Sequence, residues 1–363
     1  MRTVLTDLLG IDLPILLSPM AGGPVTPALA AAVSNAGGLG ALGLGYDQPD
    51  AIRKAIAETR ALTKKPFAVN LFAPDPVKPS AERFAAASAA LAPYRFRLGV
   101  KAPDGPDPRL PDFARQLDAV IDAKVPVFSF TFNLMSDDAM SALRGADIKI
   151  VGTATTAREA RILMASGVDA IVAQGSEAGG HRGTFNRGAA DDPADTLIGT
   201  LALVPQVAAA VDVPVIAAGG IMDGRGIAAA LALGASGVQM GTAFLAAAEA
   251  GTSKAHRAAL AEATDDATAI TRVFTGRRAR GLRTRFMVDM EQSGAPILPY
   301  PLQIGLTRPL REAALAAGSA EFSPFFAGQA APLHRAMPAG ELIRTLVREY
   351  AEARRALPTT DRE

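Results

Sequence analysis

Residues 214–242, PVIAAGGIMDGRGIAAALALGASGVQMGT, contain the pattern that decides the fold. A short apolar run (214–218) ends in two glycines, and an alanine-rich segment with helical spacing follows it (224–233). A second apolar run (237–241) then leads into Thr242. Continuous apolar runs of this length predict parallel strands buried on both faces, because such strands lack a polar side. The stretch therefore predicts a strand–helix–strand unit.

The same unit recurs along the chain, and several predicted helices start at a capping residue such as Asp50, Ser136 or Thr156. The predicted strands are 14–18, 39–43, 66–70, 126–130, 148–152, 170–174, 214–218 and 237–241. The predicted helices are 26–36, 50–62, 112–124, 137–145, 156–166, 197–211, 224–233 and 243–249. This repeat favours an α/β fold of the TIM (β/α)₈ barrel type over an open doubly wound sheet, which stays the alternative.

Two segments are longer than the repeat requires. A proline-rich insertion occupies 73–111, and a long tail follows the last predicted strand. We therefore expect a barrel at 1–250 that includes the insertion, and a smaller, largely helical capping domain at 251–310. C-terminal helices at 311–363 are expected to return to the barrel. Within them, the spacing of apolar residues predicts an amphipathic helix over 341–357.

Composition excludes several kinds of site. The chain has no cysteine, which rules out disulfides, thiolate metal sites, iron–sulfur clusters and cysteine nucleophiles. A net charge of +1 gives no reason to expect nucleic acid or an anionic membrane as partner. The arginine-rich stretch 272–286 is expected to be solvated surface, with contact to an anionic substrate as the alternative. No metal site is expected either, because no paired histidines occur and Asp191–Asp192 is typical of a solvated loop.

The ends and the hydropathy of the chain predict its location. The N-terminus is too acidic, and its apolar run too short, for a secretory signal. No uncharged apolar stretch reaches transmembrane length. We therefore expect a cytoplasmic protein, either a monomer or a homodimer.

Glycines after the last two predicted strands indicate an anion site. Gly219 and Gly220 follow one strand, and Gly241 with Thr242 follows the next. Loops at the carboxyl ends of barrel strands carry the active site, and the last two usually bind phosphate through backbone amides. The alternative is that these glycines only make tight turns.

The loop after the sixth predicted strand, QGSEAGGHRGTF (174–185), holds His181 among four glycines. A histidine at the barrel mouth is suited to proton abstraction or to stabilising a developing charge. The other two histidines, His256 and His334, are expected at the surface. Arg182 is a candidate for attracting an anionic substrate, and Tyr46 for substrate recognition.

Four motifs resemble the nitronate monooxygenases, formerly called 2-nitropropane dioxygenases, of the class with a GGHRG motif. They are LSPMAGG (17–23), VNLFAP (69–74), VGTATTAREA (151–160) and QGSEAGGHRGTF (174–185). The resemblance implies a non-covalent FMN at the barrel mouth and His181 facing the substrate. It implies flavin contacts from Met20, Ala21, Gly22, Asn70, Gln174, Gly179, Gly220, Gln239, Met240, Gly241 and Thr242. Tyr300 would recognise substrate, with simple packing as the alternative.

The implied reaction is oxidation of an alkyl nitronate, such as propionate 3-nitronate, by O₂ to a carbonyl compound and nitrite. His181 would act as a base where a neutral nitroalkane must first lose a proton. The main alternative is an FMN-dependent NAD(P)H oxidoreductase acting on a quinone or an enoyl thioester. A non-redox phosphate-binding barrel and a flavin carrier are further alternatives.

Overall fold

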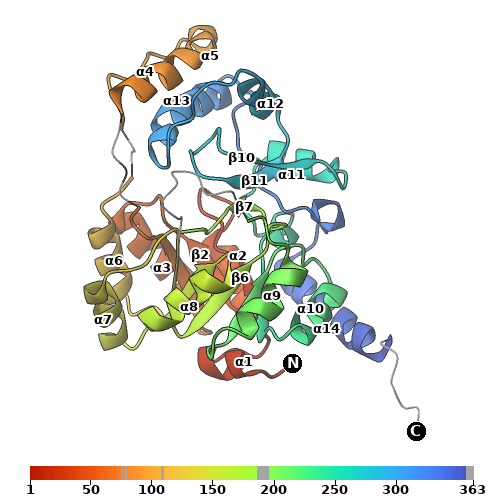
Figure 1. Cartoon of the computed structure of the whole chain (residues 1–363). Helices are drawn as coiled ribbons and strands as arrows, with labels where there is room; N and C mark the ends of the chain where they lie inside the picture. The colour runs from red at the N-terminus through yellow and green to blue at the C-terminus, as the bar shows by residue number, and fades with distance from the viewer. Residues whose placement is uncertain (76, 78–79, 108–109, 186–195, 357–363) are drawn as a thin grey trace.

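The computed structural model describes residues 1–75, 77, 80–107, 110–185 and 196–356 (Figure 1). Its centre is a sheet of eight parallel strands in the order β1-β9-β8-β6-β5-β4-β3-β2. The strands are β1 (Ile15–Leu17), β2 (Gly40–Gly43), β3 (Phe67–Phe72), β4 (Val127–Thr131), β5 (Lys149–Ala154), β6 (Ala170–Gln174), β8 (Val215–Ala218) and β9 (Gly237–Met240). Leu39 joins the two edges, since its amide donates to the Ile15 carbonyl at 3.0 Å and its carbonyl accepts from the Leu17 amide at 2.9 Å. The predicted TIM barrel is confirmed, and each predicted strand overlaps an observed one.

Helices surround the barrel and bury one face each against it. They are α2 (Pro27–Asn35), α3 (Pro49–Leu62), α6 (Phe113–Asp122), α7 (Asp137–Gly145), α8 (Ala157–Ser166), α9 (Thr200–Ala208) and α10 (Gly224–Ala232). The Ser136 and Thr156 side chains cap α7 and α8 as predicted. Asp50 does not cap α3, which begins at Pro49 after Gln48, because proline at the first helical position needs no backbone donor. Inside the barrel, inward-facing side chains form a core that α1 (Val4–Leu9) closes at one end with Leu5 and Leu9.

The predicted helix at 243–249 is wrong. Only a short 3₁₀ helix, η1 (Thr242–Phe244), forms there, and turns follow. Residues 243–247 are all buried, so this alanine-rich run has no solvent face of the kind a barrel helix carries. The eighth barrel helix is instead α14 (Ala339–Ala356), which packs against α10 and α2. The chain thus leaves the barrel after β9, builds a cap, and then returns to close the helical ring.

The cap combines helices with a small antiparallel sheet above the mouth of the barrel. Its helices are α11 (Lys254–Ala261), α12 (Arg285–Gln292) and α13 (Leu302–Ala316), and its sheet has the order β10 (Thr268–Thr271), β11 (Ala279–Leu282), β7 (Gly180–His181). The insertion contributes α4 (Ala81–Ala90) and α5 (Ala92–Leu98). Ala87 of α4 and Leu91, which lies between the two helices, pack into the same core as Phe286 and Phe322. The segment that returns to the barrel includes η2 (Ala331–Leu333). The division of the chain at residues 250 and 310 stays a prediction, and residue 310 lies within α13.

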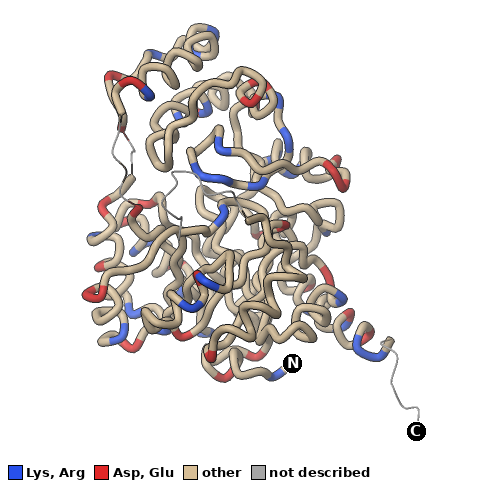
Figure 2. Tube along the Cα trace, viewed as in Figure 1, with Lys and Arg blue, Asp and Glu red and all other residues tan. Residues whose placement is uncertain are grey.

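The arginine-rich stretch 272–286 is not the solvated surface expected from the sequence. All of β11 is buried, and the Arg277 and Arg280 side chains are buried with it. Figure 2 shows Lys and Arg positions along β11, between the cap and the barrel. Their guanidinium groups are held by carbonyl oxygens of other segments, which a local pattern cannot reveal. None of the described helices has the length and apolar character of a membrane span.

Candidate active site

A cavity of about 660 Å³ lies between the carboxyl ends of the barrel strands and the cap. This volume is within the usual range for cofactor and substrate sites. All the predicted flavin contacts line it, and so does His181. These residues are Met20, Ala21, Gly22, Asn70, Gln174, Gly179, Gly220, Gln239, Met240, Gly241 and Thr242. The structure therefore brings together residues from barrel loops that are far apart in sequence.

Backbone amides on one side of the cavity lack acceptors. Gly219 and Gly220 follow β8 with φ of +120° and +71°, conformations that L side chains rarely adopt. The Gly220 and Gly241 amides make no hydrogen bond to another described residue. Gly220 is exposed and Gly241 is half-buried, so both amides are open to the cavity and are suited to an anion such as a phosphate. The Asp223 side chain caps the following helix by accepting from the Gly226 amide at 2.9 Å.

Hydrogen bonds hold both ends of the loop that carries His181. The Gln174 carboxamide donates to the His181 carbonyl at 2.9 Å and accepts from the Gly183 amide at 2.8 Å. The Arg182 guanidinium is buried and donates to the carbonyls of Gln174 and Gly175. Gln174 lines the cavity but also orients the loop. Arg182 does not line the cavity, so the predicted attraction of an anionic substrate by this residue is not supported.

His181 belongs to the barrel loop in sequence but to the cap sheet in structure. It lies in β7, which pairs with β11 through Ala279. Its Nε2 lies 2.9 Å from the Thr275 hydroxyl oxygen, which comes from the turn before β11. Cap and barrel therefore fix the imidazole together, and neither could do so alone.

An aromatic group surrounds the imidazole. The ring centroids of Phe132 and Phe326 lie 5.4 and 5.3 Å from that of His181, and Phe72 lies 6.4 Å away. Burial lowers the pKa of His181 from 6.5 to about 3, and the nearby charge of Arg277 lowers it further in the same direction. His181 is therefore neutral at physiological pH, because its half-buried ring lies against aromatic groups and the charge that acts on it, that of Arg277, is positive.

Tyr300, predicted to recognise substrate, does not line the cavity. It is buried behind Phe132, with 5.2 Å between their ring centroids, which is the packing role left open by the sequence. Burial raises the pKa of Tyr300 well above 10, with a further contribution from Tyr46. Its hydroxyl has no hydrogen-bond partner of good geometry among the described residues, although Tyr46 is near enough to affect its pKa. Tyr46 does line the cavity, and burial raises its pKa to about 12.

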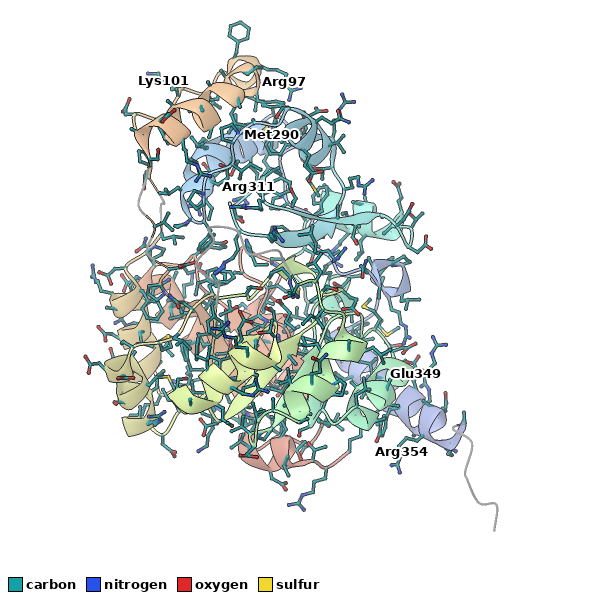
Figure 3. The ribbon with its side chains drawn as sticks, in the orientation of Figure 1. Arg97, Lys101, Met290, Arg311, Glu349 and Arg354 are labelled. Atoms are coloured by element: carbon teal, nitrogen blue, oxygen red, sulfur yellow. The ribbon has the colours of Figure 1, made fainter. Side chains whose placement is uncertain are left out.

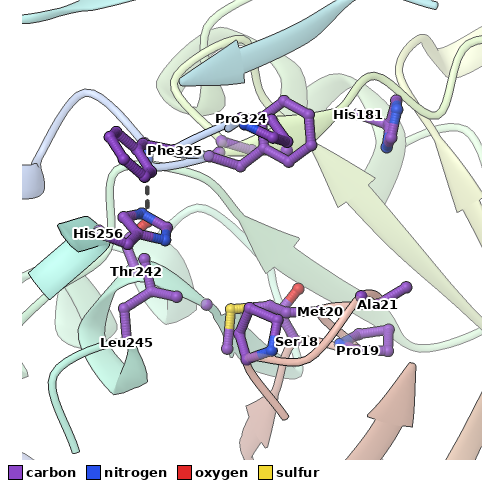
Figure 4. Close-up of a pocket in the computed structure, with 18 of the residues that line it drawn as sticks. Ser18, Pro19, Met20, Ala21, His181, Thr242, Leu245, His256, Pro324 and Phe325 are labelled. Atoms are coloured by element: carbon purple, nitrogen blue, oxygen red, sulfur yellow. Dashed lines mark hydrogen bonds between the residues drawn. The ribbon is translucent and has the colours of Figure 1, made fainter. Parts of the chain in front are cut away.

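His256 corrects a prediction, because this histidine is not at the surface. Only 6% of the residue is exposed, and it lines the cavity with its ring stacked on Phe325 at 5.2 Å (Figure 4). Burial lowers its pKa to about 4. The polar sequence SKAHRAAL hid this position because the residue that covers it, Phe325, comes much later in the chain. His334 is half-buried, and its Nδ1 lies 3.2 Å from the Ala331 carbonyl oxygen.

The chain returns from the cap across loop six at very close range. The Gln329 amide donates to the Glu177 carbonyl at 2.9 Å, and the Gly328 amide donates to the Thr242 hydroxyl at 2.9 Å. A Cβ on Gly179 would lie 2.6 Å from the backbone of Gly328. In Figure 4 the returning segment at Pro324 and Phe325 lies above the cavity, and Met20 and Ala21 lie below it. The described residues contain no group of three or more acidic or histidine side chains that would hold a metal ion.

The match to known proteins agrees with this geometry. A family model described as nitronate monooxygenase matches residues 2–349. The chain belongs to the nitronate monooxygenase family. Like the nitronate monooxygenases, it is an oxidoreductase enzyme. The assignment to the class with the GGHRG motif stays a prediction.

Two curated relatives in this family are called probable nitronate monooxygenases. One, from Staphylococcus saprophyticus, is 41% identical over 352 residues, which are 97% of this chain and 98% of the relative. The other, from Staphylococcus aureus strain Newman, is 41% identical over 345 residues, 95% of this chain and 96% of the relative.

Two solved structures resemble the whole chain. A nitroalkane oxidase from Streptomyces ansochromogenes has a TM-score of 0.88 and 43% identity over 98% of this chain and 99% of its own. FabK from Thermotoga maritima has a TM-score of 0.75 and 34% identity, with 98% of each chain covered. Both neighbours therefore match this chain over nearly its whole length, which includes the barrel and the cap.

Proposed function

We propose that this nitronate monooxygenase family member binds FMN and oxidises alkyl nitronates with O₂ to a carbonyl compound and nitrite. One observation carries the proposal. The cavity combines acceptor-free amides at Gly220 and Gly241 with a neutral, aromatic-enclosed His181. A phosphate-bearing redox cofactor and a small anionic substrate are complementary to these two regions.

The residues present fit FMN. The Gly220 and Gly241 amides and the Thr242 region would hold its phosphate, and the turn at Met20–Gly22 with Asn70 would contact its ring system. The Asn70 side chain is oriented by a hydrogen bond of 2.9 Å to the Ser129 hydroxyl. When bound, the flavin would supply the electron acceptor for the nitronate and the site of reaction with O₂.

His181 distinguishes a nitronate from a neutral nitroalkane. With a pKa near 3, its conjugate acid is unstable, so the imidazole is a weak base for removing an α-proton. A nitronate has already lost that proton and needs only to be held. Its negative charge beside the ring would favour the protonated form of His181, which then stabilises the anion. We therefore propose nitronates, including propionate 3-nitronate, as the preferred substrates.

The alternative is a flavin-dependent NAD(P)H reductase of a quinone or an enoyl thioester. The likeness to FabK at 34% identity is the observation that keeps this function in consideration. Both functions use the same barrel and the same phosphate loops, so only the electron donor separates them. Use of O₂, the cytoplasmic location and the monomeric or homodimeric state also stay proposals.

The first test is the visible spectrum of the purified protein, with the released cofactor identified by chromatography. A flavin spectrum with FMN as the released species is expected, and a colourless protein would contradict the proposal. Oxygen uptake and nitrite release are then measured with an alkyl nitronate and with propionate 3-nitronate. Anaerobic mixing with NADH or NADPH should leave the flavin oxidised, whereas rapid bleaching would favour the reductase.

A further inference from the structure

Helix α13 presents an unusual face to the cavity. Its cavity-lining residues are Ile304, Thr307, Arg308, Arg311, Glu312 and Leu315. Their spacing of three and four places them on one side of the helix. Apolar residues at the two ends of this stripe are expected for a helix that faces a protein interior. Two arginines at its centre are not. Figure 3 shows Arg311 on the part of the cap that faces the barrel.

Neither arginine is paired with an acidic side chain among the described residues. Arg308 and Arg311 make no hydrogen bond and no ion pair within the part of the chain that the structure describes, and Glu312 is not within ion-pair distance of either. Burial lowers the pKa of Arg311, and the charge of Arg308 lowers it further. Arg308 and Arg311 are half-buried, whereas the fully buried Arg182 and Arg277 are used differently, since backbone carbonyls hold them. Two like charges, one turn apart and without a counter-ion among the described residues, are suited to binding an external anion.

Tyr46 extends the positive region toward His181. The Arg308 guanidinium carbon lies 6.0 Å from the centre of the Tyr46 ring, and Arg308, Arg311 and Arg277 all act electrostatically on the Tyr46 hydroxyl. That hydroxyl stays protonated, so it is available as a donor. Tyr46 also contacts Phe72 with 5.0 Å between ring centroids, and Phe72 in turn belongs to the aromatic group around His181. The arginines therefore connect, through the Tyr46 and Phe72 rings, with the aromatic group around His181.

We propose that Arg308, Arg311 and the Tyr46 hydroxyl form an oxyanion subsite that binds a second negative group on the substrate, away from the nitronate carbon. The group is a carboxylate or a phosphate, because both present coplanar or clustered oxygens to guanidinium donors. This inference rests on the proposed function for its substrate, but the subsite can be tested separately by binding alone. These residues determine specificity and are not expected to take part in the electron transfer.

The first test compares two nitronates of similar size, propionate 3-nitronate and butyl-1-nitronate, in steady-state oxygen uptake. In Arg308→Met/Arg311→Met, the preference in kcat/KM for the carboxylated substrate should fall about 100-fold, mostly through KM, since each charge-assisted hydrogen bond is worth about tenfold or more. Arg308→Lys/Arg311→Lys should recover part of that preference. The matched control is Arg285→Met, which removes a positive charge from an exposed site on cap helix α12 and should leave both substrates unaffected. An unchanged preference in the double methionine variant would overturn the subsite.

A binding measurement makes the result independent of turnover. Succinate, an unreactive dicarboxylate, is titrated into each purified holoprotein by calorimetry. The wild type and Arg285→Met should bind it at least about tenfold more tightly than Arg308→Met/Arg311→Met. If neither nitronate is oxidised, the proposed function fails, and this measurement alone decides the subsite. Equal succinate binding by all the proteins would then refute it.

Flavin reduction by NADH and by NADPH distinguishes a phosphate from a carboxylate as the group that binds in the subsite. If the subsite serves a phosphate, NADPH should reduce the wild-type flavin faster than NADH does under anaerobic conditions, and the double variant should lose that difference. This outcome would support the subsite and contradict the nitronate function. If neither dinucleotide reduces the flavin and the carboxylate preference falls, a carboxylate source is supported.

Discussion

The barrel side and the cap side of the cavity are built by different means. The barrel contributes glycine turns at Gly219–Gly220 and Gly241, whose Gly220 and Gly241 amides lack an acceptor among the described residues, and the rings of Phe72 and Phe132 beside His181. The cap side contributes side chains, with the ring of Phe326 beside His181 and the arginines of α13. Backbone amides of this kind recognise phosphate, a group that many ligands share. Side chains of a cap select what reacts, so specificity within this fold can change without disturbing cofactor binding.

His181 is where the two sides meet, and its replacement is expected to have the largest effect. His181→Asn keeps a polar side chain but loses the imidazole and its contact with Thr275. We expect kcat/KM for a nitronate to fall about 10–100-fold, because a hydrogen bond to the anionic substrate is lost, while flavin content stays unchanged. The measurement is oxygen uptake normalised to bound flavin. His334→Asn is the control, since His334 lies outside the cavity-lining set. Full activity in His181→Asn would show that His181 takes no part in binding or stabilising the nitronate.

The barrel side is tested by Gly220→Ala. The added Cβ would have space, lying 3.5 Å from the Glu177 Cβ, but φ of +71° is unfavourable for alanine by roughly 1–2 kcal/mol. Strain at the amide that would hold phosphate should lower FMN affinity by about tenfold or more, with a smaller effect on riboflavin. Fluorescence titration of the apoprotein with each flavin measures both affinities.

The matched control is Gly294→Ala in the cap. Gly294 has φ of +62°, and an alanine Cβ at this position would meet no atom within 4 Å, so the backbone strain is similar but distant from the cavity. The substitution should lower thermal stability to a similar degree and leave FMN affinity unchanged. An equal loss of FMN affinity in both variants would show that Gly220 acts only through stability.

The barrel side was largely predictable from the sequence and the cap side was not. Buried parallel strands such as 214–218 and 237–241 appear as continuous apolar runs, and the glycines that follow them identify the mouth. The cap depends on contacts distant in sequence. Arg277 is buried because it stacks 4.1 Å over Phe132 and donates to the Phe132 carbonyl at 2.9 Å, and no local pattern indicates this partner. His256 was misplaced for the same reason.

Helix α13 shows what signal was missed. The spacing of Arg308 and Arg311 with Ile304 and Leu315 was present in the sequence, but a stripe that mixes charge with apolar residues is also typical of a helix at the surface. The failed helix at 243–249 is the opposite case. Its residue types are typical of a helix, but residues 243–247 are all buried, so a helix here would have no face toward solvent. Composition predicts a helix reliably only where the helix has the usual surroundings, with one face buried and the other exposed to solvent.

The junction between the two sides is tested by Gly179→Ala. The new Cβ would lie 2.6 Å from the carbonyl carbon of Ala327 and from the amide of Gly328, which are backbone atoms that cannot rotate away. Overpacking of this kind typically lowers the free energy of unfolding by about 1–3 kcal/mol. Gly105→Ala is the control, since nothing lies within 4 Å of its Cβ position. Urea unfolding of both variants is the measurement, and equal midpoints would show that loop six and the returning segment are free to separate.

The last expected effect is a pH dependence of stability, which follows from the lowered pKa values of His181 and His256. Their folded-state pKa values, about 3 for His181 and about 4 for His256, lie below the unfolded value of 6.5. The unfolded chain therefore takes up protons at a pH where the folded chain does not, so the stabilising contribution is full above about pH 6.5 and is lost as the pH falls toward 4. The charged groups nearest to them, Arg277 for His181 and Arg257 for His256, are both positive and act in the same direction. Each histidine should contribute on the order of 1 kcal/mol per pH unit in this window.

Urea unfolding of the apoprotein at pH 7, 6 and 5 measures the slope, and His256→Gln should reduce it by about half. A slope that does not change in His256→Gln would mean that the pKa of His256 is the same in the folded and the unfolded protein, which would contradict its buried position beside Phe325.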